Sequence, residues 1–177
     1  RLCLAARPGL AGAPLRIFYP FVGPLFGGRR WTAISTASLL LPAFGVGYAV
    51  QNPETPYLIF IVLALLCGLG GGNFASSMAN ISFFFPKAEK GSALAINAGL
   101  GNLGVSLMQF VVPLAMTMAI FGAMGGAPQV TSAGEQLWMQ NAGFLWIPFI
   151  LAGAGLAWFG MDDLATTKSS FADQAAI

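Results

Sequence analysis

The chain has 177 residues, of which 56% are hydrophobic and 8% are charged, and it contains no histidine. A soluble globular domain normally has about 25% charged residues, so this composition is that of an integral membrane protein. The small net charge of +2 gives no sign of a nucleic-acid partner. The two cysteines, Cys3 and Cys67, lie in apolar runs without metal-ligand spacing, which indicates neither a disulfide framework nor a metal site. No motif indicates a cofactor.

Five apolar stretches are long enough to cross a bilayer, which takes about 20 residues each. They span residues 2–25, 31–50, 57–85, 92–123 and 141–160. The long alternation of an outer-membrane barrel is absent from the sequence. The sequence therefore predicts an all-α fold, a polytopic membrane helical bundle in residues 1–160, followed by a polar tail in residues 161–177.

Basic residues mark one side of this bundle. The loops near 27–30 and 86–91 and the C-terminal tail carry lysine or arginine, whereas the other two loops carry Glu54 and Glu135 and no basic residue. Short loops rich in lysine and arginine stay in the cytoplasm. We therefore expect a multi-pass protein of the cell's inner membrane, surrounded by lipid, with these loops and the tail in the cytoplasm. The first span would then start on the outer side, and the chain opens without methionine. Both observations predict that this chain is a piece of a longer protein.

Polar residues on three spans fall at a common depth. Arg16, Phe74 and Asn102 each lie about 20 Å, at a helical rise of 1.5 Å per residue, from the basic loop residue nearest in sequence. That distance is near the middle of a hydrocarbon core about 30 Å thick. Asn73 lies at the same level. The sequence thus predicts that an arginine, an aromatic ring and amide groups meet at mid-membrane.

Arg16 is the charge that lies deepest in any of these spans. An arginine there costs about 2.5–3.5 kcal/mol on insertion scales, so it should face the bundle interior or a water-filled path. One hypothesis is a structural arginine, paired with backbone carbonyls or with a carboxylate from sequence outside this chain, since the five spans contain no acidic residue. The other is a mobile anion, because the N–H fork of a guanidinium matches two oxygens of a planar oxyanion.

The fourth span, 92–123, combines glycines with a polar stripe. Close helix packing of the small-xxx-small type explains most of the glycines in this span and in the one before it. It does not explain Asn102, Ser106 and Gln109, which recur with helical spacing on one face. Polar groups in lipid need partners, so this stripe is a candidate lining for a solute path. Glycines beside it, such as Gly99 and Gly101, let the backbone approach a ligand closely.

The stretch GGGNFASSMANISFFFPKAEKGSALAINAGLGNLGVSLMQFVVPL (70–114) resembles the nitrate/nitrite porter family of the major facilitator superfamily, the NarK-type transporters. Its segment GSALAINAGLGN (91–102) is similar to the family's nitrate signature, and GAPLRIFYPF and QNPETPY also resemble the family. The resemblance implies a secondary transporter of nitrate and nitrite. It also implies that the five spans match the second to sixth of twelve helices, so that the first helix and the C-terminal half lie outside this chain.

The resemblance also assigns roles to individual residues. Arg16 resembles the family's anion-binding arginine of the N-terminal half, Asn102 the signature asparagine that hydrogen-bonds the anion, and Phe74 an aromatic beside the site. The residues around them are expected to support the site. These supporting residues are Asn73, Gly99, Gly101 and Ser106.

Several mechanisms stay open at this point. The family implies alternating access about a site between two halves, and the lack of histidine or acidic residues inside these spans favours nitrate/nitrite exchange over proton-coupled nitrate uptake. A small-anion channel and a noncatalytic membrane assembly subunit are the alternatives from other classes. We do not expect an enzyme, because the spans contain no histidine, no acidic pair and no metal-binding set.

Overall fold

The computed structural model describes residues 2–162, apart from the side chains of residues 2–7, 20–25, 123 and 124. Its elements are α1 (Leu2–Phe26), α2 (Gly28–Ser38), α3 (Leu40–Ala49), α4 (Tyr57–Cys67), α5 (Leu69–Phe84), α6 (Lys87–Met116), the 3-10 turn η1 (Gly122–Gly125), β1 (Gln129–Val130), β2 (Gln136–Leu137), α7 (Asn141–Phe144) and α8 (Trp146–Gly160). The strands of this described range form one short antiparallel hairpin in which Gln129 pairs with Leu137. The structure confirms the predicted all-α class.

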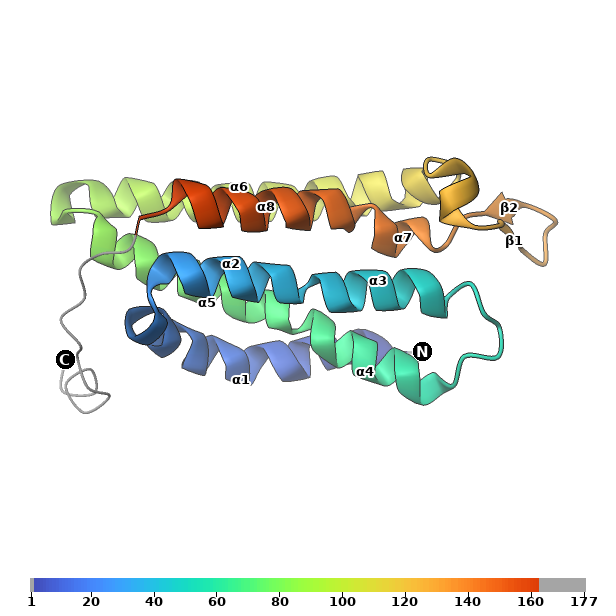
Figure 1. The fold of residues 1–177 in the computed structure, drawn as a ribbon, viewed down its shortest axis with the longest axis horizontal. Helices are drawn as coiled ribbons and strands as arrows, with labels where there is room; N and C mark the ends of the chain where they lie inside the picture. Colours follow the sequence, from blue (N-terminus) through green and yellow to red (C-terminus); the bar gives the residue numbers. More distant parts are fainter. Residues whose placement is uncertain (1, 163–177) are drawn as a thin grey trace.

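Three of the expected spans consist of two helices in line, each pair separated by one residue. The separating residues are Leu39, Gly68 and Leu145, with φ values of −69°, −62° and −54°. These are right-handed helical values, so the chain continues in the same direction and only the hydrogen-bond ladder is interrupted. Figure 1 shows α2 followed by α3, and α4 followed by α5, as pairs that run along the same course.

Helix α6 has different ends from the expected span of 92–123, because it runs from Lys87 to Met116. It begins earlier because Pro86 directly precedes its first turn in an extended conformation, and charged residues are well accommodated in an exposed first turn. It ends earlier, at Met116, and the chain after it turns through Gly122 and Gly126, whose φ angles of 51° and 80° do not occur inside a right-handed helix.

Four helical stretches within residues 2–162 are long and apolar enough to cross a membrane. They are Gly28–Ala49, Tyr57–Phe84, Lys87–Met116 and Asn141–Gly160. Helix α1 is 25 residues long, which is sufficient to span the hydrocarbon core. It is not among those four, because its sequence includes Arg7, Arg16 and several prolines that lower its mean hydropathy.

The helices lie along one long axis, and their connections gather at two ends (Figure 1). The α1–α2 and α5–α6 connections and the end of α8 share one end, and the α3–α4 and α6–α7 connections share the other. The two loops in which the sequence concentrates basic residues therefore lie at the same end of the molecule. Helix α5 packs against α1, α2 and α6, which makes it the helix that connects the two outer parts of the bundle.

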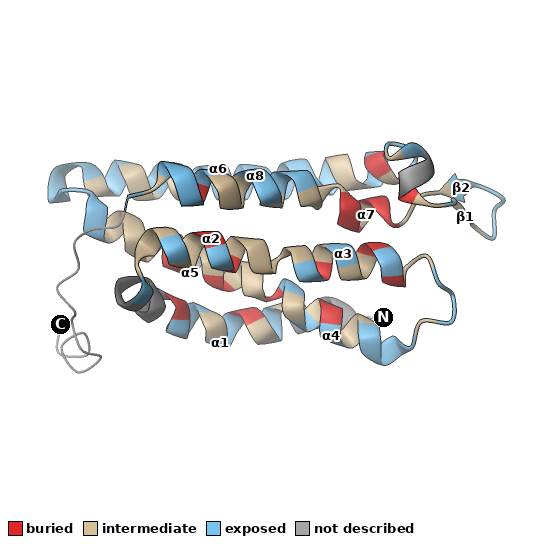
Figure 2. Cartoon of the chain, viewed as in Figure 1, coloured by how far each residue is buried: buried red, intermediate tan, exposed pale blue. Residues whose placement is uncertain are grey.

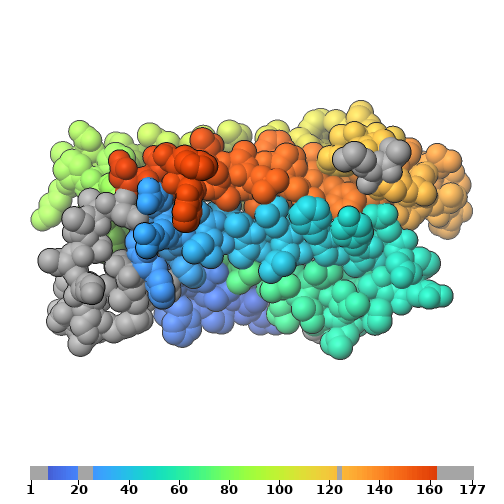
Figure 3. Space-filling model, in the orientation of Figure 1, coloured from blue at the N-terminus to red at the C-terminus, as the bar shows by residue number. Residues whose placement is uncertain are grey.

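Burial is uneven across the bundle (Figure 2). Buried residues of the described chain occur on α2, α3, α5 and α7, whereas α6 has a single buried residue, Ala115. In the space-filling view, α8 packs along α2 (Figure 3). Large apolar side chains are exposed on the outside, including Phe110 at 70% and Phe159 at 87%. Exposed apolar surface of this extent indicates contact with lipid or with other protein elements.

Two buried amides fix the connection between α6 and α7. Gln140 Nε2 donates hydrogen bonds to the carbonyl oxygens of Gly125 (2.8 Å) and Ala127 (3.1 Å). Asn141 Nδ2 donates to the carbonyl oxygens of Ala115 and Met118, both at 2.8 Å. Both side chains are fully buried. Since the last carbonyl groups of a helix lack partners within the helix, Asn141 satisfies the C-terminal end of α6.

Candidate anion-binding site

Arg16 lies on α1 and faces α5. Its Nε–H donates a hydrogen bond of 3.3 Å to the backbone carbonyl of Gly71, and the side chain is otherwise exposed. Among the described residues, Gly71 is its only hydrogen-bond partner, and no carboxylate pairs with it. The guanidinium is therefore fixed through one nitrogen, and its two terminal NH₂ groups make no hydrogen bond to another described residue.

A glycine seam holds α1 against α5 at this position. The seam consists of Gly12, Gly68, Gly71 and Gly72 together with the ring of Tyr19. A methyl group added at Gly71 would lie 3.3 Å from the Cα of Gly12, and one at Gly72 would lie 2.5 Å from the Tyr19 ring. Tyr19 is only 7% exposed and contacts Trp31 edge to face, with ring centroids 5.0 Å apart. This close packing sets the height of Arg16 relative to α5.

Phe74 lies on α5 and Asn102 on α6, where these two helices meet. The Phe74 ring lies beside Gly101, where a methyl group would be 3.6 Å from ring atom Cε2. Asn102 is the next residue along α6 and is exposed. Its side-chain amide has no hydrogen-bond partner within the described chain. Phe74 itself is 41% exposed, so both side chains are accessible from outside this chain.

The residues expected to support the site occupy different environments. Asn73 is half-buried, and its Oδ1 is enclosed without a hydrogen-bond partner among the described residues. Ser106 Oγ donates to the backbone carbonyl of Asn102 at 3.2 Å, so its proton is used within α6. A methyl group added at Gly99 would have no atom from another part of the described chain within 4 Å. The structure therefore leaves the backbone at Gly99 open to approach from outside.

Helix α5 brings the three main candidates to a similar height. Arg16 contacts α5 at Gly71, and Gly101, next to Asn102, contacts α5 at Phe74. Gly71 and Phe74 are separated by less than one helical turn, a rise of about 4.5 Å. No hydrogen bond or cation–π contact joins Arg16, Phe74 and Asn102 to one another in the part that the structure describes. They form an open, positively charged face and not an enclosed pocket.

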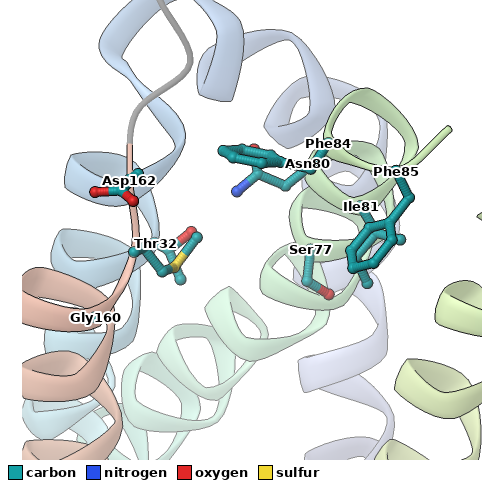
Figure 4. Close-up of a pocket in the computed structure, with 9 residues that line it drawn as sticks. Thr32, Ser77, Asn80, Ile81, Phe84, Phe85, Gly160 and Asp162 are labelled. Atoms are coloured by element: carbon teal, nitrogen blue, oxygen red, sulfur yellow. The ribbon is translucent and has the colours of Figure 1, made fainter.

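Cavities occur elsewhere, towards the end that carries the α5–α6 connection. One of about 400 Å³ is lined by Thr32 from α2, Ser77 and Asn80 from α5, and Asp162 after α8. Figure 4 shows Asn80 reaching from α5 towards Thr32 and Asp162 on the opposite wall. None of the three main candidates lines this cavity. Within residues 2–162, no group of three or more His, Cys, Asp or Glu side chains is placed to hold a metal ion.

Sequence reasoning missed two contributors to this arrangement. The Gly71 carbonyl that binds Arg16 is a backbone group, and nothing in the sequence distinguishes it from its neighbours. Asn97 was also missed, although its Nδ2 donates to Ser77 Oγ and to Met78 Sδ, both at 3.2 Å. Its helical spacing to Gly101, four residues later, was a usable signal, because residues four apart share a helix face.

Comparison with known proteins gives close relatives over nearly the whole chain. The chain is 53% identical over 176 residues to the nitrate/nitrite transporter NarU of Escherichia coli. The matched residues cover 98% of this chain and 38% of NarU. It is 52% identical over 176 residues to NarU of Salmonella typhimurium, with the same coverage of 98% and 38%. It is 48% identical over 159 residues to the probable nitrate/nitrite antiporter NarK2 of Thermus thermophilus. That match covers 88% of this chain and 36% of NarK2. The chain thus spans less than two fifths of each of these relatives. No family model matches it.

Proposed function

Because the chain belongs to the nitrate/nitrite porter family, we propose that it forms part of the N-terminal half of a transporter that moves nitrate and nitrite across the membrane. The family assignment and the long apolar helices support a multi-pass membrane protein. The relatives are named as transporters, which supports transport and not catalysis. The C-terminal half and a first helix are then supplied by sequence outside this chain.

Arg16 is the observation on which the proposal depends most. A guanidinium offers two edges that can grip an oxyanion with two parallel N–H···O bonds. The bond from Nε to Gly71 occupies one edge and leaves the edge formed by the two terminal NH₂ groups for nitrate or nitrite. With no carboxylate beside it in the described chain, the positive charge is available to an anion. The carbonyl bond then acts to orient Arg16, so the structural and the binding hypotheses are compatible.

Asn102 and Phe74 complete this half of the proposed site. Asn102 donates an amide N–H to the anion, which needs new donors once it leaves water. Phe74 provides an apolar wall that excludes water and strengthens the charge-assisted bonds. Asn73, Gly99, Gly101 and Ser106 are assigned supporting roles around them. Remaining donors come from the C-terminal half, so the open face described above is where the two halves meet.

We assign the mechanism to alternating access with nitrate/nitrite exchange. The acidic residues of the described chain lie in loops or at helix ends. They are Glu54, Glu89, Glu135 and Asp162. The spans therefore offer no carboxylate at the depth of Arg16 that could carry a proton, which supports exchange over proton-coupled uptake. In an exchanger the site changes sides only when an anion neutralises Arg16.

The proposed orientation follows from the basic end of the bundle. The loops near 27–30 and 86–91 face the cytoplasm of a cell whose inner membrane holds the protein, and residues 161–177 lead towards the second half; residues 163–177 lie outside the described range. A cysteine placed at Glu54 is expected to react with an impermeant reagent added outside. One placed at Lys87 is expected to react only after the membrane is opened. Reaction of both from outside would contradict this orientation.

The transport assay uses the full-length protein that contains this chain, reconstituted in liposomes. Nitrate uptake is expected to accelerate when the liposomes are loaded with nitrite, because exchange requires a counter-anion. Uptake independent of internal nitrite would favour a channel, and uptake driven by a pH gradient would favour proton coupling. Failure of the full-length protein to move nitrate would favour an assembly subunit. The chain of 177 residues alone is expected to move none, since it holds only half of the site.

A further inference from the structure

Helix α6 is attached to α5 at few places, and one of them is an asparagine. Asn97 is half-buried and points at α5, where its Nδ2 donates to Ser77 Oγ and Met78 Sδ, both at 3.2 Å. Beyond it towards the C-terminus α6 is open, because all residues from 101 to 110 are exposed (Figure 2). The position of α6 against α5 therefore depends strongly on this polar contact.

The contact continues to the backbone of Phe74. Ser77 accepts a hydrogen bond from Asn97 and donates its own proton to the carbonyl oxygen of Phe74 at 2.9 Å. One turn further along α6, Gly101 lies beside the Phe74 ring. Asn97 and Gly101 share a face of α6. Residues of α6 thus reach both the backbone and the side chain of Phe74.

We propose that Asn97 is a positioning residue for the anion site, which it serves by fixing α6 against α5. This inference rests on the function proposed above for Arg16, Phe74 and Asn102. Asn97 does not itself touch the anion, because it points at α5 and lies about 140° around α6 from Asn102. The Asn97–Ser77–Phe74 chain of hydrogen bonds sets the height of Asn102 relative to Phe74, and the glycine seam sets the height of Arg16 at the contact of α1 with α5.

The hydrogen bonds are suited to this role because they are directional. Apolar side chains that face lipid can slide past one another at little cost, since lipid tails are as apolar as the side chains. If α6 slides, the Asn97 amide loses its bond to the Ser77 hydroxyl. An amide without a hydrogen bond in an apolar environment costs free energy. The bonded register of α5 and α6 is consequently favoured over neighbouring registers.

The test compares variants of the full-length porter. Asn97→Leu keeps the size of the side chain but removes its donors, and Ser77→Ala removes the relay. Each is expected to raise the KM for nitrate about three- to tenfold, with the maximal rate much less affected. The double variant is expected to resemble either single variant, because both remove the same interaction. Ser82→Ala is the matched control on α5, since Ser82 Oγ bonds the Met78 carbonyl of its own helix at 2.9 Å, and it is expected to leave the KM unchanged.

A second measurement reports on position without transport. Spin labels at Phe83 and Leu103, which are 64% and 63% exposed, report the distance between α5 and α6 in a background without the native cysteines. Asn97→Leu is expected to broaden this distance distribution, and Ser82→Ala is not. Unchanged distances, or a lower unfolding temperature with an unchanged KM, would overturn the inference. A full-length protein that moves no nitrate would instead contradict the proposed function, and the distances would still decide whether Asn97 fixes α6.

Discussion

Two glycine-rich regions of this molecule use the same residue type differently. In the glycine seam, a methyl group at Gly68 would lie 2.7 Å from the carbonyl oxygen of Pro8 and 2.9 Å from the nitrogen of Gly12. In α6, a methyl group at Gly91, Gly99 or Gly104 would meet no atom within 4 Å. The first set is required by contact between two backbones of the described chain. The three glycines of α6 make no such backbone contact within residues 2–162.

The difference shows where the described chain is incomplete as a packing unit. Glycine in an exposed helix interior costs about 1 kcal/mol relative to alanine. In the seam this cost is offset by close packing, as the sequence predicted for the span 57–85. For the span 92–123 the sequence also predicted close packing of most glycines, but Gly99 and Gly104 contact no other part of the described chain. The open glycines of α6 lie on the helix that carries Asn102, which is consistent with approach by an anion or by another part of a larger protein.

Substituting the arginine that the seam positions is expected to have the largest effect. In the full-length porter, Arg16→Lys keeps the charge but lacks both the Nε bond to Gly71 and the paired terminal donors. Nitrate uptake is expected to fall by at least about tenfold at equal amounts of inserted protein. Arg30→Lys, on the exposed start of α2, is the control and is expected to transport normally. Near-normal uptake by the Arg16→Lys variant would reduce Arg16 to a general attraction for anions.

On the α6 side, Asn102→Ala tests whether the open face binds the anion. Loss of one hydrogen bond to a charged partner is expected to weaken nitrate binding by about 1.5–3 kcal/mol, roughly 10- to 150-fold in Kd. Binding of nitrate to the detergent-solubilised full-length protein measures this directly. Because Asn102 is exposed and its side chain bonds no described residue, insertion and stability are expected to be unaffected. Unchanged affinity would leave Asn102 without a role in binding.

A methyl group in the seam is expected to destabilise the chain itself. Gly68→Ala places a Cβ against backbone atoms of α1, which cannot rotate away as a side chain can. Overpacking of this kind costs about 1–3 kcal/mol. Chemical unfolding in mild detergent, followed by far-ultraviolet circular dichroism, measures the change. Wild-type stability would show that α1 and α5 are less closely packed in solution than in this structure.

The matched substitution in α6 is expected to have the smallest effect and the opposite sign. Gly104→Ala meets no neighbour in the described chain and removes a flexible residue from a helix interior. It is expected to stabilise the chain by about 0.5–1 kcal/mol in the same unfolding experiment. Destabilisation would mean that α6 packs against a part of the chain outside the described residues.

The sequence predicted the parts of this arrangement that local patterns encode. Apolar length predicted the helical bundle, and helical rise predicted that Arg16, Phe74 and Asn102 lie at similar heights. The single-residue interruptions at Leu39 and Leu145 were not predictable, since neither residue is a turn former.

The cross-helix hydrogen bonds were also beyond the sequence. Arg16 bonds Gly71 across 55 positions, and Asn97 bonds Ser77 across 20. Such pairs depend on how the helices are rotated about their axes, which composition and periodicity do not specify. Close packing is the sequence-based prediction for most glycines of α6, because spacing alone does not distinguish a glycine that touches a neighbour from one that does not.

The buried amides between α6 and α7 have a consequence for how the protein is made. Ribosomal synthesis proceeds from the N-terminus, so α6 is complete before Asn141 has been made. Only then can Asn141 donate hydrogen bonds to the carbonyls of Ala115 and Met118. Until then the end of α6 has to remain in contact with water or with the machinery that inserts it into the membrane. We therefore expect release of α6 into the bilayer to be coupled to the arrival of α7. A nascent chain that stalls before Gln140 would hold its last complete helix uncapped at the membrane surface.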